Sequence, residues 1–199
     1  MDYDSIVKMN PSDRFELAMN PSTSNEVRDM IVKSYVEEKD CEDFTHGLGE
    51  ECDTPELMDY CLHSGNEDIM VGLAENPNVT EDILLGLSEC DNDWVLYHVA
   101  SNNKTPKDVS IKLFERVCVC PDVEIRQIIS EVRLPKHIYA IMAKDEDEQV
   151  RINIAENDRT PKEVLTYMAN DKSEDVKVGL LYNIHTPNVI KAKLRKELE

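Results

Sequence analysis

Residues 148–169, which read EQVRINIAENDRTPKEVLTYMA, decide the fold. Val150, Ile154 and Ala155 fall along one side of a first helix, with Arg151 on its polar edge. Asn157 follows where a residue that tolerates left-handed backbone geometry can end a helix. The first half of the stretch therefore predicts a short amphipathic helix that stops at an asparagine.

The second half of the stretch predicts another short helix. Thr160 offers a side-chain oxygen to the free N–H groups of that helix, Pro161 suits its first position, and Glu163 completes a capping box. An apolar stripe follows at Val164, Leu165 and Met168. With about three linking residues, the two helices must lie antiparallel or cross steeply, and neither buries its stripe without neighbours.

This helical pair is repeated along the chain. The expected starts of the second helix are spaced by 26, 25, 29, 26 and 26 residues, at Pro55, Glu81, Pro106, Pro135, Pro161 and Pro187. The first helix keeps the same register, because an apolar residue precedes the hinge asparagine by seven positions at Ile69–Asn76, Val95–Asn102, Val150–Asn157 and Val176–Asn183. In the fifth copy Val132 replaces the asparagine, so we expect an altered hinge there.

A period of about 26 residues predicts an all-α protein, an α-solenoid in which stacked helical pairs build a continuous core. The pattern V-R-x-x-x-A-x-N-x-x-T-P-x-x-x-L, most complete from Val150 to Leu165, resembles the leucine-rich repeat variant family, a relative in form of HEAT-like helical repeats. This resemblance covers residues 13–190 and implies a right-handed superhelix of alternating longer and shorter helices. A resemblance in fold carries little information on function.

The domain organisation follows from the repeat. Residues 1–53 are predicted to form an N-terminal cap and an acidic irregular segment, and residues 54–199 the helical repeats, stacked with the cap as one elongated domain. The cap contains a helix around residues 12–19 and a longer one from about residue 25 to 37. Residues 37–53, with Gly47 and Gly49 in an acidic context, are expected to form a loop or a distorted unit.

Targeting and cofactor signals are weak in this sequence. It has no run of 18 apolar residues and no basic, then apolar, N-terminal segment, so we expect a cytoplasmic protein without a membrane contact. The six cysteines are expected to be free thiols, with Cys61 in the core. Because close C-x-x-C pairs and short histidine motifs are missing, we expect no metal centre and no cofactor.

Charge is distributed unevenly. Residues 1–100 contain 24 Asp or Glu and five Lys or Arg, whereas residues 101–199 contain 17 of each kind. No cation occurs between Lys39 and Lys104, across 64 residues that carry 16 carboxylates. An acidic surface that maintains solubility explains the sign of this charge, but not its segregation. A contact surface for a basic protein partner explains both.

We therefore interpret the protein as non-catalytic, binding and modulating a protein partner through its acidic half. The predicted contact residues are the acids of this half and its one tryptophan: Asp40, Glu42, Asp43, Glu50, Glu51, Asp53, Glu56, Asp59, Glu67, Asp68, Asp91, Asp93 and Trp94. Trp94 is either a packing residue at the start of a helix or an exposed aromatic anchor. The oligomeric state is left open by the sequence.

Two other functional classes remain as alternatives. Carboxylates along a helical repeat can imitate the phosphate array of DNA, so the chain is also compatible with a phage-type DNA mimic that inhibits a host nucleic-acid-binding enzyme. An enzyme is less compatible, because no nucleotide-binding loop or nucleophile motif occurs and one Trp and three Phe offer little for an aromatic pocket. Direct nucleic-acid binding is not expected, since the acidic half would repel phosphates.

A further expectation concerns ion pairs between copies. Arg126, Arg151 and Lys177 occupy equivalent positions, each a few residues after an acid. We expect these cations to pair with Asp122, Glu148 and Asp175 in a ladder that is structural in role.

Overall fold

The computed structural model describes residues 1–37 and 42–199. The chain divides into two compact units, residues 1–110 and 111–199, each described here by itself. The division between residues 110 and 111 does not coincide with the end of the predicted cap at residue 53. It falls within the helix Lys107–Val117.

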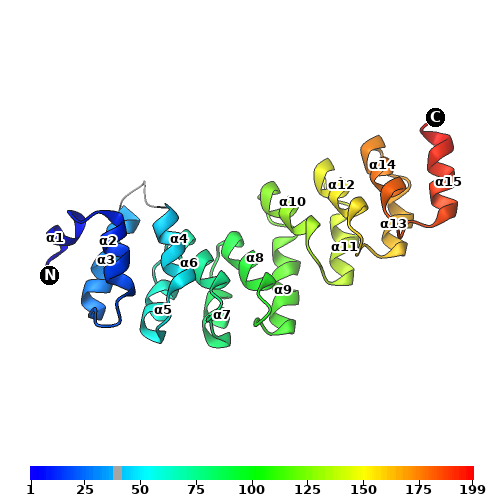
Figure 1. Cartoon of the computed structure of the whole chain (residues 1–199). Coiled ribbons are helices and arrows are strands. Elements are labelled where there is room, and N and C mark those ends of the chain that lie inside the picture. Colours follow the sequence, from blue (N-terminus) through cyan, green and yellow to red (C-terminus); the bar gives the residue numbers. More distant parts are fainter. Residues whose placement is uncertain (38–41) are drawn as a thin grey trace. The chain divides into compact units, whose positions relative to one another are not determined.

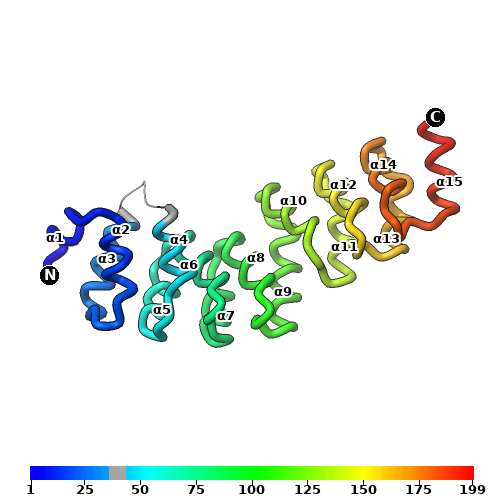
Figure 2. The backbone as a smooth tube through the Cα atoms, in the orientation of Figure 1, coloured from blue at the N-terminus to red at the C-terminus, as the bar shows by residue number. Residues whose placement is uncertain are grey.

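The described residues form fifteen helices and no strand, which confirms the all-α prediction. Figure 1 labels the helices, and Figure 2 traces the backbone through them. Their bounds are α1 Tyr3–Val7, α2 Pro11–Met19, α3 Asn25–Glu37, α4 Glu42–Glu51, α5 Pro55–Leu62, α6 Glu67–Glu75, α7 Glu81–Leu87, α8 Asp93–Ser101, α9 Lys107–Val117, α10 Val123–Glu131, α11 Lys136–Met142, α12 Glu148–Glu156, α13 Lys162–Met168, α14 Glu174–Tyr182 and α15 Asn188–Glu197.

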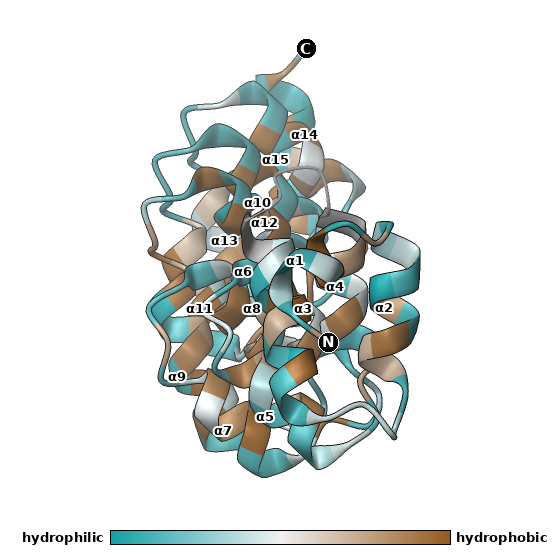
Figure 3. Cartoon of the chain, turned by 90° about the vertical axis from the view of Figure 1, so that its left-hand side faces the viewer, coloured by the Kyte–Doolittle hydropathy of each residue, from teal (hydrophilic) through white to brown (hydrophobic). Residues whose placement is uncertain are grey.

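Within each unit, alternate helices pack against each other. In residues 1–110, α4 packs on α2 and α6, and α6 packs on α8; in residues 111–199, α12 packs on α10 and α14. Helices such as α2, α5 and α7 carry both apolar and polar stretches (Figure 3). The apolar positions of the pattern are buried, including Ile69, Val95, Val150 and Val176. None of the described helices combines the length and apolar character needed to span a bilayer.

The acidic segment before residue 53 is more regular than expected. The expectation of a loop over residues 37–53 is wrong for residues 42–51, which form α4. A β-carbon on Gly49 would overlap the Ile69 carbonyl oxygen, and one on Gly72 would overlap the His46 carbonyl oxygen. These two glycines therefore let the backbones of α4 and α6 touch, which is a packing role rather than a loop role.

Each hinge asparagine of the pattern is bound through both atoms of its amide group. Its Oδ1 accepts a hydrogen bond from the backbone N–H two residues further on, at 2.7 to 2.9 Å. Its Nδ2 donates to a backbone carbonyl 27 or 28 residues earlier, in the preceding copy. These bonds are Asn76 to Gly49 at 2.9 Å, Asn102 to Ala74 at 2.7 Å, Asn157 to Ser130 at 3.0 Å and Asn183 to Ala155 at 2.8 Å.

The hinge geometry corrects the sequence prediction. Asn157 has φ −65° and ψ 119°, so its backbone is not left-handed, and no described residue other than Gly65 has positive φ. The asparagine is present for its side-chain amide and not for its tolerance of unusual backbone angles. At Val132 the hinge is altered as expected, with ψ at 177° and no amide to donate.

The predicted cap at Thr160 is also wrong. Pro161, with ψ 143°, precedes α13, and no side-chain hydrogen bond caps this helix. The Thr160 hydroxyl instead donates to the Ile154 carbonyl at 2.6 Å, which ties the hinge back to the first helix. Thr54 and Thr80, by contrast, do cap α5 and α7 by accepting from Leu57 and Ile83.

The ladder of ion pairs exists in residues 111–199 with partners other than those predicted. Arg126 pairs with Asp145 at 2.8 Å, Arg151 with Asp171 at 2.9 Å and Lys177 with Glu197 at 2.6 Å. Asp122, Glu148 and Asp175 stay at the starts of their helices, where they favour the helix dipole. Because the Arg151 and Asp171 side chains are only 5% and 10% exposed, breaking this pair is expected to cost about 3–5 kcal/mol, more than an exposed pair would.

Gly49→Ala is expected to lower the free energy of unfolding by about 3 kcal/mol, because the added methyl group meets the α6 backbone, which cannot move aside alone. Gly47→Ala in the same helix is the control. Its β-carbon would make ordinary contact with Phe15 at 3.5 Å, so the change should be neutral or stabilising by about 1 kcal/mol. Urea unfolding followed by circular dichroism measures both; equal effects would contradict the close approach.

Asn183→Asp is expected to lower the free energy of unfolding by about 2 kcal/mol, since a carboxylate keeps the local acceptor but faces two carbonyl oxygens without a proton to donate. Asn188→Asp is the matched control, because this exposed residue opens α15, where a negative charge is favourable. Thermal and urea unfolding of the two variants compare the positions. An unchanged stability of Asn183→Asp would show that the hinge amide is not a major contact.

Candidate interaction surface

Most of the predicted contact residues lie at the two ends of the row of helices α4, α6 and α8 instead of in one cluster, while Glu56 and Asp59 lie in α5. Glu67, Asp68 and Asp93 lie in the first turns of α6 and α8, whereas Glu50 and Glu51 end α4. Helices α6 and α8 are parallel, because Asn92 at the start of α8 contacts Glu67, and Asn102 at its end contacts Ala74. Helix α4 runs the same way, since Thr45 near its start contacts Asp68 and Gly49 near its end contacts Asn76. The acids of these three helices therefore form two separate borders of the row.

Most of these acids face solvent. The exposed ones are Glu50, Glu51, Asp53, Glu56, Asp59, Glu67 and Asp91, while Asp68, Asp93 and Trp94 are half-buried. Asp40 lies outside the described residues, and only the backbone of Glu42 and Asp43 is described. Two acids bind neighbouring copies: Glu67 accepts from Asn92 at 2.8 Å, and Asp68 lies 3.4 Å from the Thr45 hydroxyl.

A cluster on the same helix row was missed by the sequence analysis. Glu75, the last residue of α6, has one carboxylate oxygen 2.9 Å from His98 Nδ1 of α8 and the other 3.1 Å from His46 Nε2 of α4. Glu50 lies 3.8 Å from the same His46 nitrogen. The available signal was the hinge register, since Glu75 and His98 lie one and four positions before their hinge asparagines.

Aromatic rings extend this cluster along α8. The Trp94 ring is stacked on the His98 ring with centroids 6.4 Å apart, and Tyr97 meets His98 edge-on at 4.9 Å. Trp94 is thus partly packed and partly exposed, a position between the two alternatives that its sequence context allowed.

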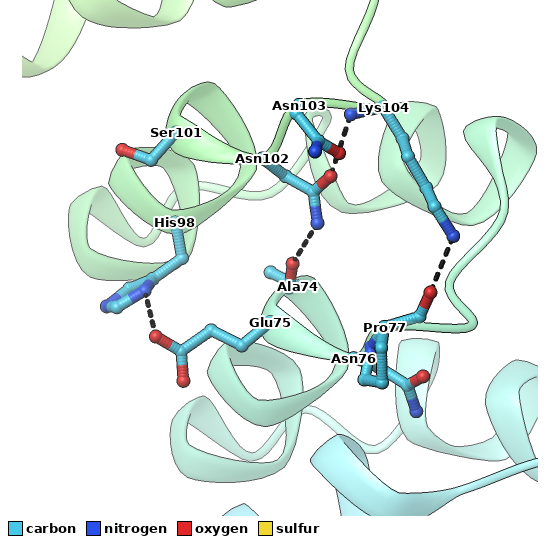
Figure 4. A pocket seen from close by; sticks show the side chains of 9 residues that line it. All are labelled: Ala74, Glu75, Asn76, Pro77, His98, Ser101, Asn102, Asn103 and Lys104. Atoms are coloured by element: carbon cyan, nitrogen blue, oxygen red, sulfur yellow. Dashed lines mark hydrogen bonds and ion pairs between the residues drawn. The ribbon is translucent and has the colours of Figure 1, made fainter. Parts of the chain in front are cut away.

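A shallow cavity of about 570 Å³ lies beside the cluster. In Figure 4 the Glu75–His98 pair borders it on one side and Lys104 on the other. The Lys104 ammonium donates to the Pro77 carbonyl at 2.7 Å and to the Val79 carbonyl at 3.1 Å. Lys104, the first cation after residues 40–103, therefore links its own hinge to the hinge that follows Asn76 across this cavity.

Burial determines the protonation of His98. Desolvation lowers the pKa of His98 below its ordinary value, and the neighbouring His46 lowers it further, whereas the Glu75 carboxylate acts in the opposite direction. The neutral imidazole therefore predominates at pH 7, and its partner Glu75 is not neutralised by it. The pair presents negative charge beside an aromatic surface.

Other chemistry finds little support in the described residues. They contain no group of three or more His, Cys, Asp or Glu side chains placed to hold a metal ion. Cys52, Cys61, Cys90, Cys118 and Cys120 are free thiols, and Cys61 is buried as predicted. The surface offers charge, aromatic area and hydrogen-bonding groups for a partner.

Comparison of the chain with protein-family models, curated proteins and solved structures finds no match. The surface must therefore be interpreted from its own residues.

The His98 ring is expected to titrate below the ordinary histidine value of about 6.5 in the folded protein. Because the unfolded chain then binds more protons, this group's contribution to stability is present above that value and is lost as the pH falls towards the folded pKa. An NMR pH titration measures the pKa, and His98→Asn assigns the resonance. In Glu75→Gln the pKa of His98 should fall further; a rise in that variant would contradict the assigned role of the carboxylate.

Proposed function

We propose that this protein is a non-catalytic interaction protein that binds and modulates a basic protein partner through the acidic surface of residues 1–110. The proposal retains the cytoplasmic location expected from the sequence. The observation that carries it is the exposure of acids without cationic partners. Among the described residues, no lysine or arginine forms an ion pair with Glu51, Asp53 or Glu56.

The architecture that would present this surface is an α-solenoid with a period of about 26 residues. The hinge amide bonds support it, because the same asparagine contacts the preceding copy 27 or 28 residues earlier in both units. Membership of the leucine-rich repeat variant or HEAT-like families remains a proposal based on the V-R-x-x-x-A-x-N pattern alone.

The charge explains why a basic partner fits. Like charges on one unit repel each other when it folds, and an oppositely charged partner reduces this repulsion. Acids at helix starts, such as Glu67 and Asp93, are partly accounted for by the helix dipole. Glu51 and Asp53 lie at and beyond the end of α4, where negative charge is unfavourable for the helix, so a structural role does not explain them.

A DNA mimic is the second candidate. The two acidic borders of the α4–α6–α8 row favour it, since duplex DNA likewise presents two strands of negative charge. In that case the partner is a nucleic-acid-binding enzyme, and duplex DNA competes with the protein for it.

The test is capture of a partner from lysate at about 0.1 M and about 1 M salt, followed by affinity measurement with the isolated partner. Glu51→Gln/Asp53→Asn/Glu56→Gln is expected to weaken binding about tenfold, because three carboxylates of the contact surface lose their charge. The control variant is Glu156→Gln/Asp158→Asn/Glu163→Gln, which removes an equal number of negative charges from exposed positions of the other unit. It should change affinity less than about twofold.

The outcomes separate the candidates. A partner that is lost at high salt and displaced by duplex DNA supports mimicry, and one that DNA does not displace supports the adaptor. Equal losses for both triple variants would place the contact outside the acidic surface and contradict the proposal.

A further inference from the structure

The carboxylate of Glu75 has an unusual set of partners for an acidic protein. Both of its oxygens are occupied by imidazole nitrogens, from His46 at 3.1 Å and from His98 at 2.9 Å. An imidazole carries a positive charge only when protonated, unlike the guanidinium of Arg126 or Arg151 in the other unit. Because the imidazole of His98 is neutral at pH 7, its hydrogen bond leaves the negative charge of the Glu75 carboxylate in place.

This carboxylate remains accessible. The Glu75 side chain is 40% exposed, that of His46 is 37% exposed, and that of His98 is 20% exposed. The cavity of about 570 Å³ beside Glu75 and His98 leaves room for a side chain to approach (Figure 4). Lys104, on the far side of the cavity, directs its ammonium group at the carbonyls of Pro77 and Val79.

An aromatic face lies next to the carboxylate. Trp94 stacks on His98, which itself contacts Glu75, so the indole and the carboxylate are separated by one imidazole ring. Tryptophan is the aromatic side chain that attracts cations most strongly, and it is half-buried here, with part of its surface open. A flat cation that stacks on an aromatic ring and forks onto a carboxylate is the guanidinium of arginine.

We infer that the Glu75–His98–Trp94 surface is the anchor point for an arginine of the basic partner, whose guanidinium binds the Glu75 carboxylate and stacks against the aromatic rings of α8. This inference rests on the proposed function, which supplies the basic partner, and adds the side chain that is recognised and the place where it binds. Charge complementarity identifies the occupant, because no lysine or arginine occurs in the sequence from residue 40 to 103.

Acidification weakens this anchor. The titratable groups at the site are His46 and Glu50 on α4, Glu75 on α6, His98 with the Tyr97 phenol on α8, and Lys104 after α8. Protonated His98 is itself a counterion for Glu75 and repels a second cation. The partner's arginine is therefore displaced as His98 becomes charged.

The experiment uses the full chain and a fluorescein-labelled peptide of alternating arginine and alanine, with binding followed by fluorescence anisotropy at about 0.1 M salt. Glu75→Gln keeps the shape of the side chain but removes its charge and one of its two acceptor oxygens, and it is expected to reduce affinity about tenfold; Trp94→Leu should reduce it about fivefold. Glu89→Gln, at an exposed acid of the same unit that is not one of the predicted contact residues, is the matched control and should reduce it less than about twofold. Circular dichroism confirms that each variant is folded.

Two further readouts distinguish an arginine anchor from general attraction to an acidic protein. The same peptide with lysine in place of arginine should bind the wild type more weakly than the arginine peptide does. The two peptides should bind Glu75→Gln equally. Lowering the pH from about 7.5 through the pKa of His98, as measured by NMR, should weaken binding by the wild type, and His98→Gln should reduce this dependence.

Equal losses for Glu75→Gln and Glu89→Gln would overturn the anchor, as would an unchanged pH dependence in His98→Gln. If the peptide does not bind while the lysate partner is still captured, the anchor is wrong and the proposed function stands. If no partner is captured from lysate at low salt, the proposed function itself fails.

Discussion

The side-chain amide of the hinge asparagine is the interaction on which the rest of the structure depends. Its oxygen holds the turn after one helix, and its nitrogen donates to a carbonyl of the preceding copy. Asn76 and Asn183 are almost fully buried, at 1% and 3% exposed, so an amide left unpaired there would be costly. The bond therefore defines both the turn and the register between neighbouring helices.

The surface cluster is a consequence of this register. The bond from Asn102 to Ala74 holds the end of α8 beside the end of α6, which places His98 next to Glu75. The contact of α4 with α6 at Gly49 and Gly72 brings His46 to the other oxygen of the same carboxylate. A larger residue at either glycine would separate these helices and the cluster with them.

The two units differ in how their acidic side chains are paired. In residues 111–199, Arg126 and Arg151 lie in buried pairs with Asp145 and Asp171, so their acids are neutralised internally. In residues 1–110 the equivalent positions are the apolar Met70 and Leu96. The acids of that unit consequently stay at the surface, where histidine, asparagine and threonine are the partners that the structure provides for several of them.

The sequence by itself determined the helical class, the buried apolar positions such as Val150 and the location of most hinges, because these follow from local periodicity and turn residues. It did not determine what Asn157 and Thr160 bind, since their partners lie in the preceding copy or helix and the same residues also serve as ordinary caps. Only the tertiary structure decided that Glu75 meets two histidines 29 and 23 residues away, because helix packing, not spacing along the chain, brings such groups together.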